Sequence, residues 1–180
     1  MKKFRLYYNK DEELKWIQRL CNEGWALEKF FAGVYTFVPC EPGQYIYDID
    51  LLGDGPDEFE TYREFMEDAG VEVVQRWYRW VFLRKKAEDG PFDMYTDPRS
   101  KVEAYGKIKK FFRGAMLLEL LILVFEATLL IASPTKTQWG IFLFCVVVIA
   151  AFTMAMLKNI WYCDFKIKQL LEEAGNYEEN

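Results

Sequence analysis

Two apolar stretches decide the architecture of this chain: GAMLLELLILVFEATLLIA at residues 114–132 and WGIFLFCVVVIAAFTMAML at residues 139–157. Each is about 19 residues long, which at about 1.5 Å of rise per residue gives a helix of about 29 Å. That length matches the hydrocarbon core of a bilayer, about 30 Å thick. The alternative is a helical hairpin buried in a globular core, but apolar runs in core helices are typically about 10–14 residues long. The sequence therefore predicts a transmembrane hairpin.

Charged residues around the hairpin predict its orientation. Basic residues flank both outer ends: Lys107, Lys109, Lys110 and Arg113 precede the first run, and Lys158 follows the second. The connecting loop offers only Lys136. Because segments rich in Lys and Arg stay on the cytoplasmic side, we expect both termini to be cytoplasmic. The four basic residues before the first run are expected to contact anionic lipid headgroups.

The domain organisation expected from these spans has seven parts. They are a cytoplasmic α+β domain (1–86), a linker (87–100), a basic juxtamembrane helix (101–113), a transmembrane helix (114–132), an external loop (133–138), a second transmembrane helix (139–157) and a cytoplasmic tail (158–180).

The expected α+β domain contains two similar cycles of secondary structure. The first has a strand at 3–8, a helix capped by Asn9 and ended by Gly24, and a hairpin of strands 25–31 and 34–38. The second has a strand at 44–52, a helix at 57–69, and a hairpin of strands 71–76 and 80–85. A shift of 46 residues superposes Asp11 on Asp57 and Gly24 on Gly70. Two strand–helix–strand–strand repeats predict an antiparallel sheet with both helices on one face, a ferredoxin-like α+β sandwich.

Composition excludes several classes of function. The chain has no histidine, and its four cysteines, Cys21, Cys40, Cys145 and Cys163, show no C-x-x-C spacing. This removes Ser-His and Cys-His catalysis and the common zinc sites that contain histidine, so we expect neither an enzyme nor a bound cofactor. Residues 1–100 carry 14 basic and 20 acidic residues, whereas surfaces that bind nucleic acid are basic. Scattered free thiols fit a reducing compartment, although a Cys21–Cys40 disulfide stays open.

Glu119 and Glu126 lie inside the first apolar run, seven residues apart and therefore on one face of a helix. An ionised acid near the bilayer centre costs about 2.5–3.5 kcal/mol and usually faces protein or water. Three interpretations stay open: contact with another helix, a protonated or water-reaching pair without a function, and an ion or proton site. The second run contains no Lys or Arg, so we expect any cationic partner to come from another chain.

Two features of the soluble domain are further candidate sites. Asp48 and Asp50 share one face of a strand, close to Asp54, Asp57 and Glu58. Paired carboxylates can bind Mg²⁺ or Ca²⁺ or act as acid and base. Their spacing matches no calcium loop, so a solvated sheet face is the simpler interpretation. Aromatic residues at the hairpin tips predict a protein-binding surface, made of Phe31, Trp77, Tyr78 and Arg79.

Four segments resemble a bacterial family catalogued as domain of unknown function 2812. They are KKFRLYYNKDEELKWI (2–17), GWALEKFFAGVYTF (24–37), YIYDIDLL (45–52) and DMYTDPRSKVEAYGKIKKFF (93–112). The resemblance implies two membrane helices after the domain and a gene often found beside a PadR-like transcriptional regulator. It therefore implies a role in a membrane-associated regulatory or stress-response module. It implies no catalytic residues.

These observations predict a non-enzymatic protein of the bacterial cell membrane that acts as an anchor, sensor or adaptor. Its cytoplasmic domain would bind a protein partner, by resemblance a PadR-like regulator, and its helices would allow a homo-oligomer. The alternative is a small transport or envelope-stress component that uses Glu119 and Glu126 in the membrane.

Overall fold

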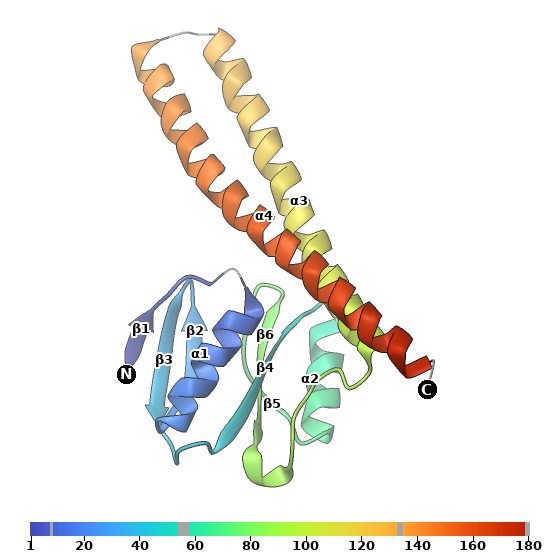
Figure 1. Cartoon of the computed structure of the whole chain (residues 1–180). Helices are drawn as coiled ribbons and strands as arrows, with labels where there is room; N and C mark the ends of the chain where they lie inside the picture. Colours follow the sequence, from blue (N-terminus) through green and yellow to red (C-terminus); the bar gives the residue numbers. More distant parts are fainter. Residues whose placement is uncertain (8, 54–57, 133–134, 179–180) are drawn as a thin grey trace. The chain divides into compact units, whose positions relative to one another are not determined.

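The structure is a computed structural model that describes residues 1–7, 9–53, 58–132 and 135–178 (Figure 1). It contains two compact units, Met1–Thr96 (unit 1) and Asp97–Asn180 (unit 2), which are treated separately below. Unit 1 is an α+β domain, and unit 2 consists of two long helices. The predicted α+β class and the two long apolar helices are thus confirmed.

The predicted order of strand, helix, strand and strand occurs twice in unit 1 (Figure 1). The first repeat consists of β1 (Lys2–Phe4), α1 (Lys10–Asn22), β2 (Trp25–Phe31) and β3 (Val34–Pro39). The second consists of β4 (Tyr45–Leu51), α2 (Glu58–Asp68), β5 (Glu72–Trp77) and β6 (Trp80–Lys86).

The 46-residue shift also relates fine details of the two repeats. The β2–β3 pairing is interrupted between Leu27 and Lys29, and the β5–β6 pairing is interrupted at the equivalent positions, between Val73 and Gln75. Gly24 and Gly70 both have positive φ after a helix, as expected for left-handed helix ends. At the hairpin tips, Ala32 and Tyr78 both have positive φ. The two halves of unit 1 therefore share one backbone plan.

The described strands form two three-stranded antiparallel sheets, with the orders β1-β3-β2 (sheet A) and β4-β6-β5 (sheet B). In each repeat the third strand lies between the other two, so each repeat completes its own sheet. The single sheet of the expected ferredoxin-like sandwich is not confirmed, because that arrangement interleaves strands of both halves.

Two side chains of sheet B hydrogen-bond to the backbone of Leu27, on an edge strand of sheet A. The Leu27 amide on edge strand β2 donates to the Tyr47 hydroxyl at 3.0 Å, and the Leu27 carbonyl accepts from Arg84 Nη1 at 3.2 Å. Arg84 also binds both carboxylate oxygens of Glu72, at 2.8 and 2.7 Å. An edge strand with unpaired backbone groups is prone to wrong pairing, so these contacts both join the sheets and protect β2.

Two core clusters lie on opposite faces of sheet B. The first contains residues of α1 and of both sheets: Trp16, Ile17, Leu20, Cys21, Leu27, Phe30, Tyr35, Phe37, Tyr47, Ile49 and Phe82. The second contains Leu52, Met66, Val71, Val81 and Leu83, with Phe59 and Tyr62 of α2 packed against it. Since neighbouring strand residues point to opposite faces, Phe82 faces α1 while Val81 and Leu83 face α2. The expectation that both helices cover one face is therefore wrong.

The segment after β6 packs against the second core cluster. A short 3₁₀ helix, η1 (Ala87–Asp89), is followed by residues 92–95, here called the strap. Phe92 and Met94 of the strap pack against the second core cluster. Unit 1 consequently extends to Thr96, beyond the expected boundary at residue 86.

Unit 2 consists of α3 (Pro98–Ala132) and α4 (Lys136–Glu178), which pack on each other. The less exposed positions recur every three or four residues, at Phe112, Met116, Glu119, Leu123, Glu126 and Leu130 of α3 and at Phe142, Cys145, Ile149, Thr153, Met156, Ile160 and Cys163 of α4. This spacing is typical of paired helices. The basic helix and first span expected from the sequence form one continuous helix, and α4 continues far beyond residue 157.

A half-buried acid beside the first core cluster makes unit 1 sensitive to pH. Tyr35 donates its hydroxyl hydrogen to Glu13 Oε1 at 2.5 Å. Burial raises the pKa of Glu13 from 4.5 to about 7, although the hydrogen bond from Tyr35 opposes the shift. A raised pKa means that the folded state holds the proton more tightly than the unfolded chain. The contribution of Glu13 to stability is therefore full below pH 4.5 and is lost as the pH rises to about 7.

Replacing Glu13 with Gln should remove this dependence, because Gln can accept the Tyr35 hydrogen bond without titrating. Thermal unfolding of the full chain in detergent, followed by tryptophan fluorescence, should show a smaller loss of melting temperature between pH 4.5 and 7 in Glu13→Gln than in the parent. Glu12→Gln, an exposed neighbour in the same helical turn, is the control. Equal slopes in the parent and Glu13→Gln would contradict the assignment.

Candidate functional site

The tips of the two hairpins of unit 1 lie side by side. Phe30 of β2 contacts Trp77 of β5 edge to face, with ring centroids 5.4 Å apart. Tyr78 at the β5–β6 tip is 69% exposed. Arg79 is only half-buried and donates from Nε to the Leu52 carbonyl at 2.8 Å. Of the predicted protein-binding residues, Trp77 and Tyr78 thus present aromatic surface, while Arg79 holds the tip in place.

Phe31 lies apart from this group, on the outer face of sheet A. Its neighbour Phe30 points inward to the core and to Trp77, so Phe31 points outward by strand alternation. Phe31 pairs in register with Val34, and Val34 pairs with Phe4. The structure therefore divides the predicted surface into a Trp77–Tyr78 tip and a separate Phe31 face.

Asp50 is buried and the Asp48 side chain is only 13% exposed, which corrects the expectation of a solvated sheet face. They lie on the face of β4 that is turned toward α2 and the strap, and Asp50 is 6% exposed. Of the other acidic residues predicted beside them, Asp54 and Asp57 are outside the described residues.

Partners from distant segments satisfy both carboxylates. Asp50 accepts from the hydroxyls of Tyr62 at 3.0 Å and Tyr95 at 2.9 Å. Asp48 accepts from the Met94 amide at 3.4 Å and lies 3.9 Å from Lys10 Nζ. These bonds tie α2 and the strap to β4. A buried polar group without partners costs about 1–3 kcal/mol. The folded strap supplies such partners to both carboxylates and so stabilises unit 1.

The network also changes the acidity of its members. Burial raises the pKa of Asp48, and the nearby Lys10 charge opposes that shift. Burial raises the pKa of Tyr62 well above its usual range, and the Asp50 carboxylate adds to the effect. Tyr62 therefore acts as a fixed hydrogen-bond donor at neutral pH. Sequence reasoning missed the roles of Tyr62 and Tyr95, since nothing in their local pattern points to β4.

Glu119 is engaged by the second helix of the same hairpin. Thr153 of α4 donates from Oγ1 to Glu119 Oε2 at 2.7 Å. Glu126 is also half-buried on this face of α3, and no hydrogen bond or ion pair of Glu126 is found within the described part of the chain. The two glutamates therefore face α4, with one of them paired.

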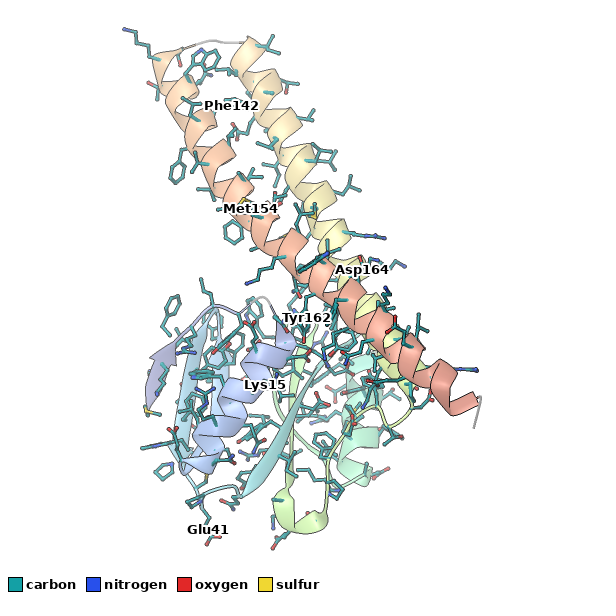
Figure 2. The ribbon with its side chains drawn as sticks, viewed as in Figure 1. Lys15, Glu41, Phe142, Met154, Tyr162 and Asp164 are labelled. Atoms are coloured by element: carbon teal, nitrogen blue, oxygen red, sulfur yellow. The ribbon has the colours of Figure 1, made fainter. Side chains whose placement is uncertain are left out.

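The basic residues before the first apolar run differ in their surroundings. Lys109 forms a salt bridge with Asp164 of α4, the residue labelled in Figure 2. Lys107 is exposed and lies 3.5 Å from Glu103 of the same helix. Lys110 and Arg113 are exposed. Lys109 consequently helps to pair the helices, and the other three basic groups extend into the surroundings.

The thiols and acids present no metal centre within residues 1–7, 9–53, 58–132 and 135–178. Cys21 and Cys40 are free thiols. The buried Cys21 Sγ donates to the Tyr45 carbonyl at 3.5 Å. Burial raises the pKa of Cys40, and the neighbouring Cys21 thiol adds to the shift. A raised pKa lowers the thiolate fraction, so Cys40 does not resemble an activated nucleophile.

The family model described as Protein of unknown function (DUF2812) matches residues 9–117, which include most of unit 1 and the polar first half of α3. The chain is a member of the DUF2812 family. No curated protein and no solved structure matches it. The DUF2812 description names no activity, so the function must be inferred from the residues themselves.

The bond between Glu119 and Thr153 predicts an energetic coupling between the two helices of this DUF2812 protein. Interhelical hydrogen bonds inside membranes contribute about 0.6 kcal/mol on average. A double-mutant cycle of Glu119→Leu and Thr153→Val, followed by unfolding in mixed micelles, should give a coupling near that value. A second cycle of Glu126→Leu and Thr153→Val should give none, because about two helical turns separate Glu126 from this bond. Equal couplings in both cycles would contradict the assignment.

Proposed function

We propose that this DUF2812 protein is an integral protein of the bacterial cell membrane whose cytoplasmic domain binds a protein partner. In this proposal unit 2 anchors the chain by crossing the membrane twice, with both termini in the cytoplasm. The protein acts as a non-enzymatic anchor, sensor or adaptor in a regulatory or stress-response module.

One observation supports the membrane location above all others. In the most apolar part of α3 only 6% of the residues are buried, and in that of α4 none is. A core helix of a soluble protein would bury its apolar side chains against other parts of the chain. Large exposed apolar surfaces mark contact with a membrane or another protein. The length of both helices favours hydrocarbon, and the basic flanks favour the cytoplasmic placement of the ends.

The proposed protein-binding site is the Trp77–Tyr78 tip. Tyr and Trp dominate interface hot spots because they bury a large area at a small entropic cost. Arg76 is exposed beside them and donates from Nε to the Tyr78 carbonyl at 2.9 Å, which holds the backbone of the tip. The tip is therefore supported before any partner arrives.

The charge of the soluble part favours a basic partner. Residues 1–100 carry 14 basic and 20 acidic residues, and opposite charges speed and orient association. A transcriptional regulator carries a basic nucleic-acid-binding surface, so a PadR-like regulator, suggested by the family resemblance, fits this requirement.

Glu126 favours a second candidate function. Its half-buried carboxyl group lies within the apolar part of α3, where ionisable side chains are costly and usually functional. Transport or envelope-stress signalling through Glu119 and Glu126 would require further helices from additional copies to enclose a polar path. A phenotype that needs unit 2 alone would favour this candidate over the adaptor.

The adaptor proposal predicts a specific cytosolic partner that depends on Tyr78. Cross-linking of the tagged full-length protein in cells, followed by mass spectrometry, should identify one abundant partner. Tyr78→Ala should reduce its capture by about 30-fold or more, because truncating a hot spot costs about 2 kcal/mol. Phe65→Ala is the matched control, since Phe65 is 66% exposed but lies on α2. Equal capture by both variants would contradict the proposal.

A further inference from the structure

The outer face of sheet A presents an ordered combination of apolar and basic side chains. One register row across the three strands contains Phe4, Val34 and Phe31, and the row on the same face two residues away contains Lys2, Thr36 and Lys29. Phe4, Val34 and Phe31 are all exposed, with Phe31 66% exposed. Lys2 and Lys29 are exposed as well. An apolar row at the tip of the sheet is therefore bordered by a basic row.

Leu6 extends the apolar row over the tip of the β2–β3 hairpin. A Cβ atom at Gly33 would lie 2.8 Å from Leu6 Cδ2 and 3.1 Å from Phe4 Cε2. Only glycine leaves room for these two side chains, and Gly33 also has a φ of +83° that favours glycine. Leu6 is itself largely exposed. Phe4, Leu6, Phe31 and Val34 thus form one continuous projection, here called the apolar ridge.

The described residues of unit 1 leave the ridge uncovered. Helix α1 packs against the other face of sheet A, where Tyr35 and Phe37 of β3 are buried. Contiguous apolar groups on a surface mark an interaction site. Large apolar side chains beside lysines are the pattern of proteins that lie in a membrane interface.

We propose that the apolar ridge and its lysines dock on a membrane surface that contains anionic lipid. This inference rests on the proposed membrane location of unit 2. The aromatic and leucine side chains of the ridge enter the boundary between headgroups and acyl chains, while Lys2 and Lys29 contact lipid phosphates. The lipid-binding face is separate from the Trp77–Tyr78 tip, so unit 1 can hold lipid and a protein partner at the same time.

Charge and connectivity favour lipid over a second copy of the chain. Lys2 and Lys29 both lie on this face although residues 1–100 have an acidic excess, and Glu28 is the exposed acid beside them on β2. Two copies placed face to face would bring lysines together, which is unfavourable. An anionic bilayer complements these charges, and the covalent link at Thr96 to α3 keeps unit 1 at a high effective concentration near the membrane.

The test is photo-cross-linking of the full-length chain in vesicles. A benzophenone side chain replaces Phe31 in one protein and, as the matched control, Phe65 in another. Both positions are 66% exposed, but Phe65 lies on α2 between the acidic residues Glu64 and Glu67. Each protein is placed in vesicles of phosphatidylcholine alone or mixed with phosphatidylglycerol. Flotation establishes whether the chain is in the membrane, and mass spectrometry identifies the adducts.

We expect lipid adducts from the Phe31 position in vesicles that contain phosphatidylglycerol, with far fewer from the Phe65 position. The double variant Lys2→Gln, Lys29→Gln should lower the adduct yield by about 25-fold, because each lysine near an anionic surface contributes about fivefold. Three results with a chain that floats would overturn the docking proposal alone. They are no lipid adducts at the Phe31 position, equal lipid adducts at the Phe31 and Phe65 positions, and adducts to a second copy of the protein. A chain that fails to float would overturn the membrane location as well.

Discussion

Burial of sheet B on both faces is the constraint on which unit 1 depends. Phe82 belongs to the core that α1 covers, and Val81 and Leu83 belong to the core that α2 covers. The same two-sided burial places Asp50 inside the protein, where Tyr62 and Tyr95 satisfy its carboxylate. Since Tyr95 directly precedes the segment that leads into α3, the chain leaves unit 1 from a fixed point.

The two units differ in how their apolar surface is shielded from water. Unit 1 buries its apolar residues in two clusters and satisfies its buried acids internally. Unit 2 leaves most of the apolar surface of α3 and α4 uncovered, and a hydrocarbon environment would remove that surface from water. On this account the hydrogen bond from Thr153 to Glu119 is a polar seam within a pair of lipid-facing helices.

Local patterns predicted much of the fold, and long-range contacts explain the failures. Apolar length predicted α3 and α4, and local alternation, helical spacing and turn signals predicted the order of the elements in both repeats. The alternation in β4 wrongly predicted a solvent-exposed face for Asp48 and Asp50. The residues that cover this face, Tyr62, Met94 and Tyr95, are distant in sequence, so the local pattern does not show them. Local patterns also failed to predict the division into two sheets, because that division depends on which strands pair with one another. The hairpin tips were found as aromatic clusters, but only strand register separates Phe31 from Trp77.

The proposed membrane topology is tested by the accessibility of cysteines to a membrane-impermeant maleimide in intact and in permeabilised cells. Peptide mass spectrometry assigns the label to each site in variants that carry Thr137→Cys or Glu103→Cys. We expect labelling of the Thr137 position in intact cells, labelling of the Glu103 position only after permeabilisation, and protection of the native Cys145 in both. Labelling of the Glu103 position in intact cells, or of Cys145 as readily as the other two, would contradict a hairpin that crosses the membrane with both ends in the cytoplasm.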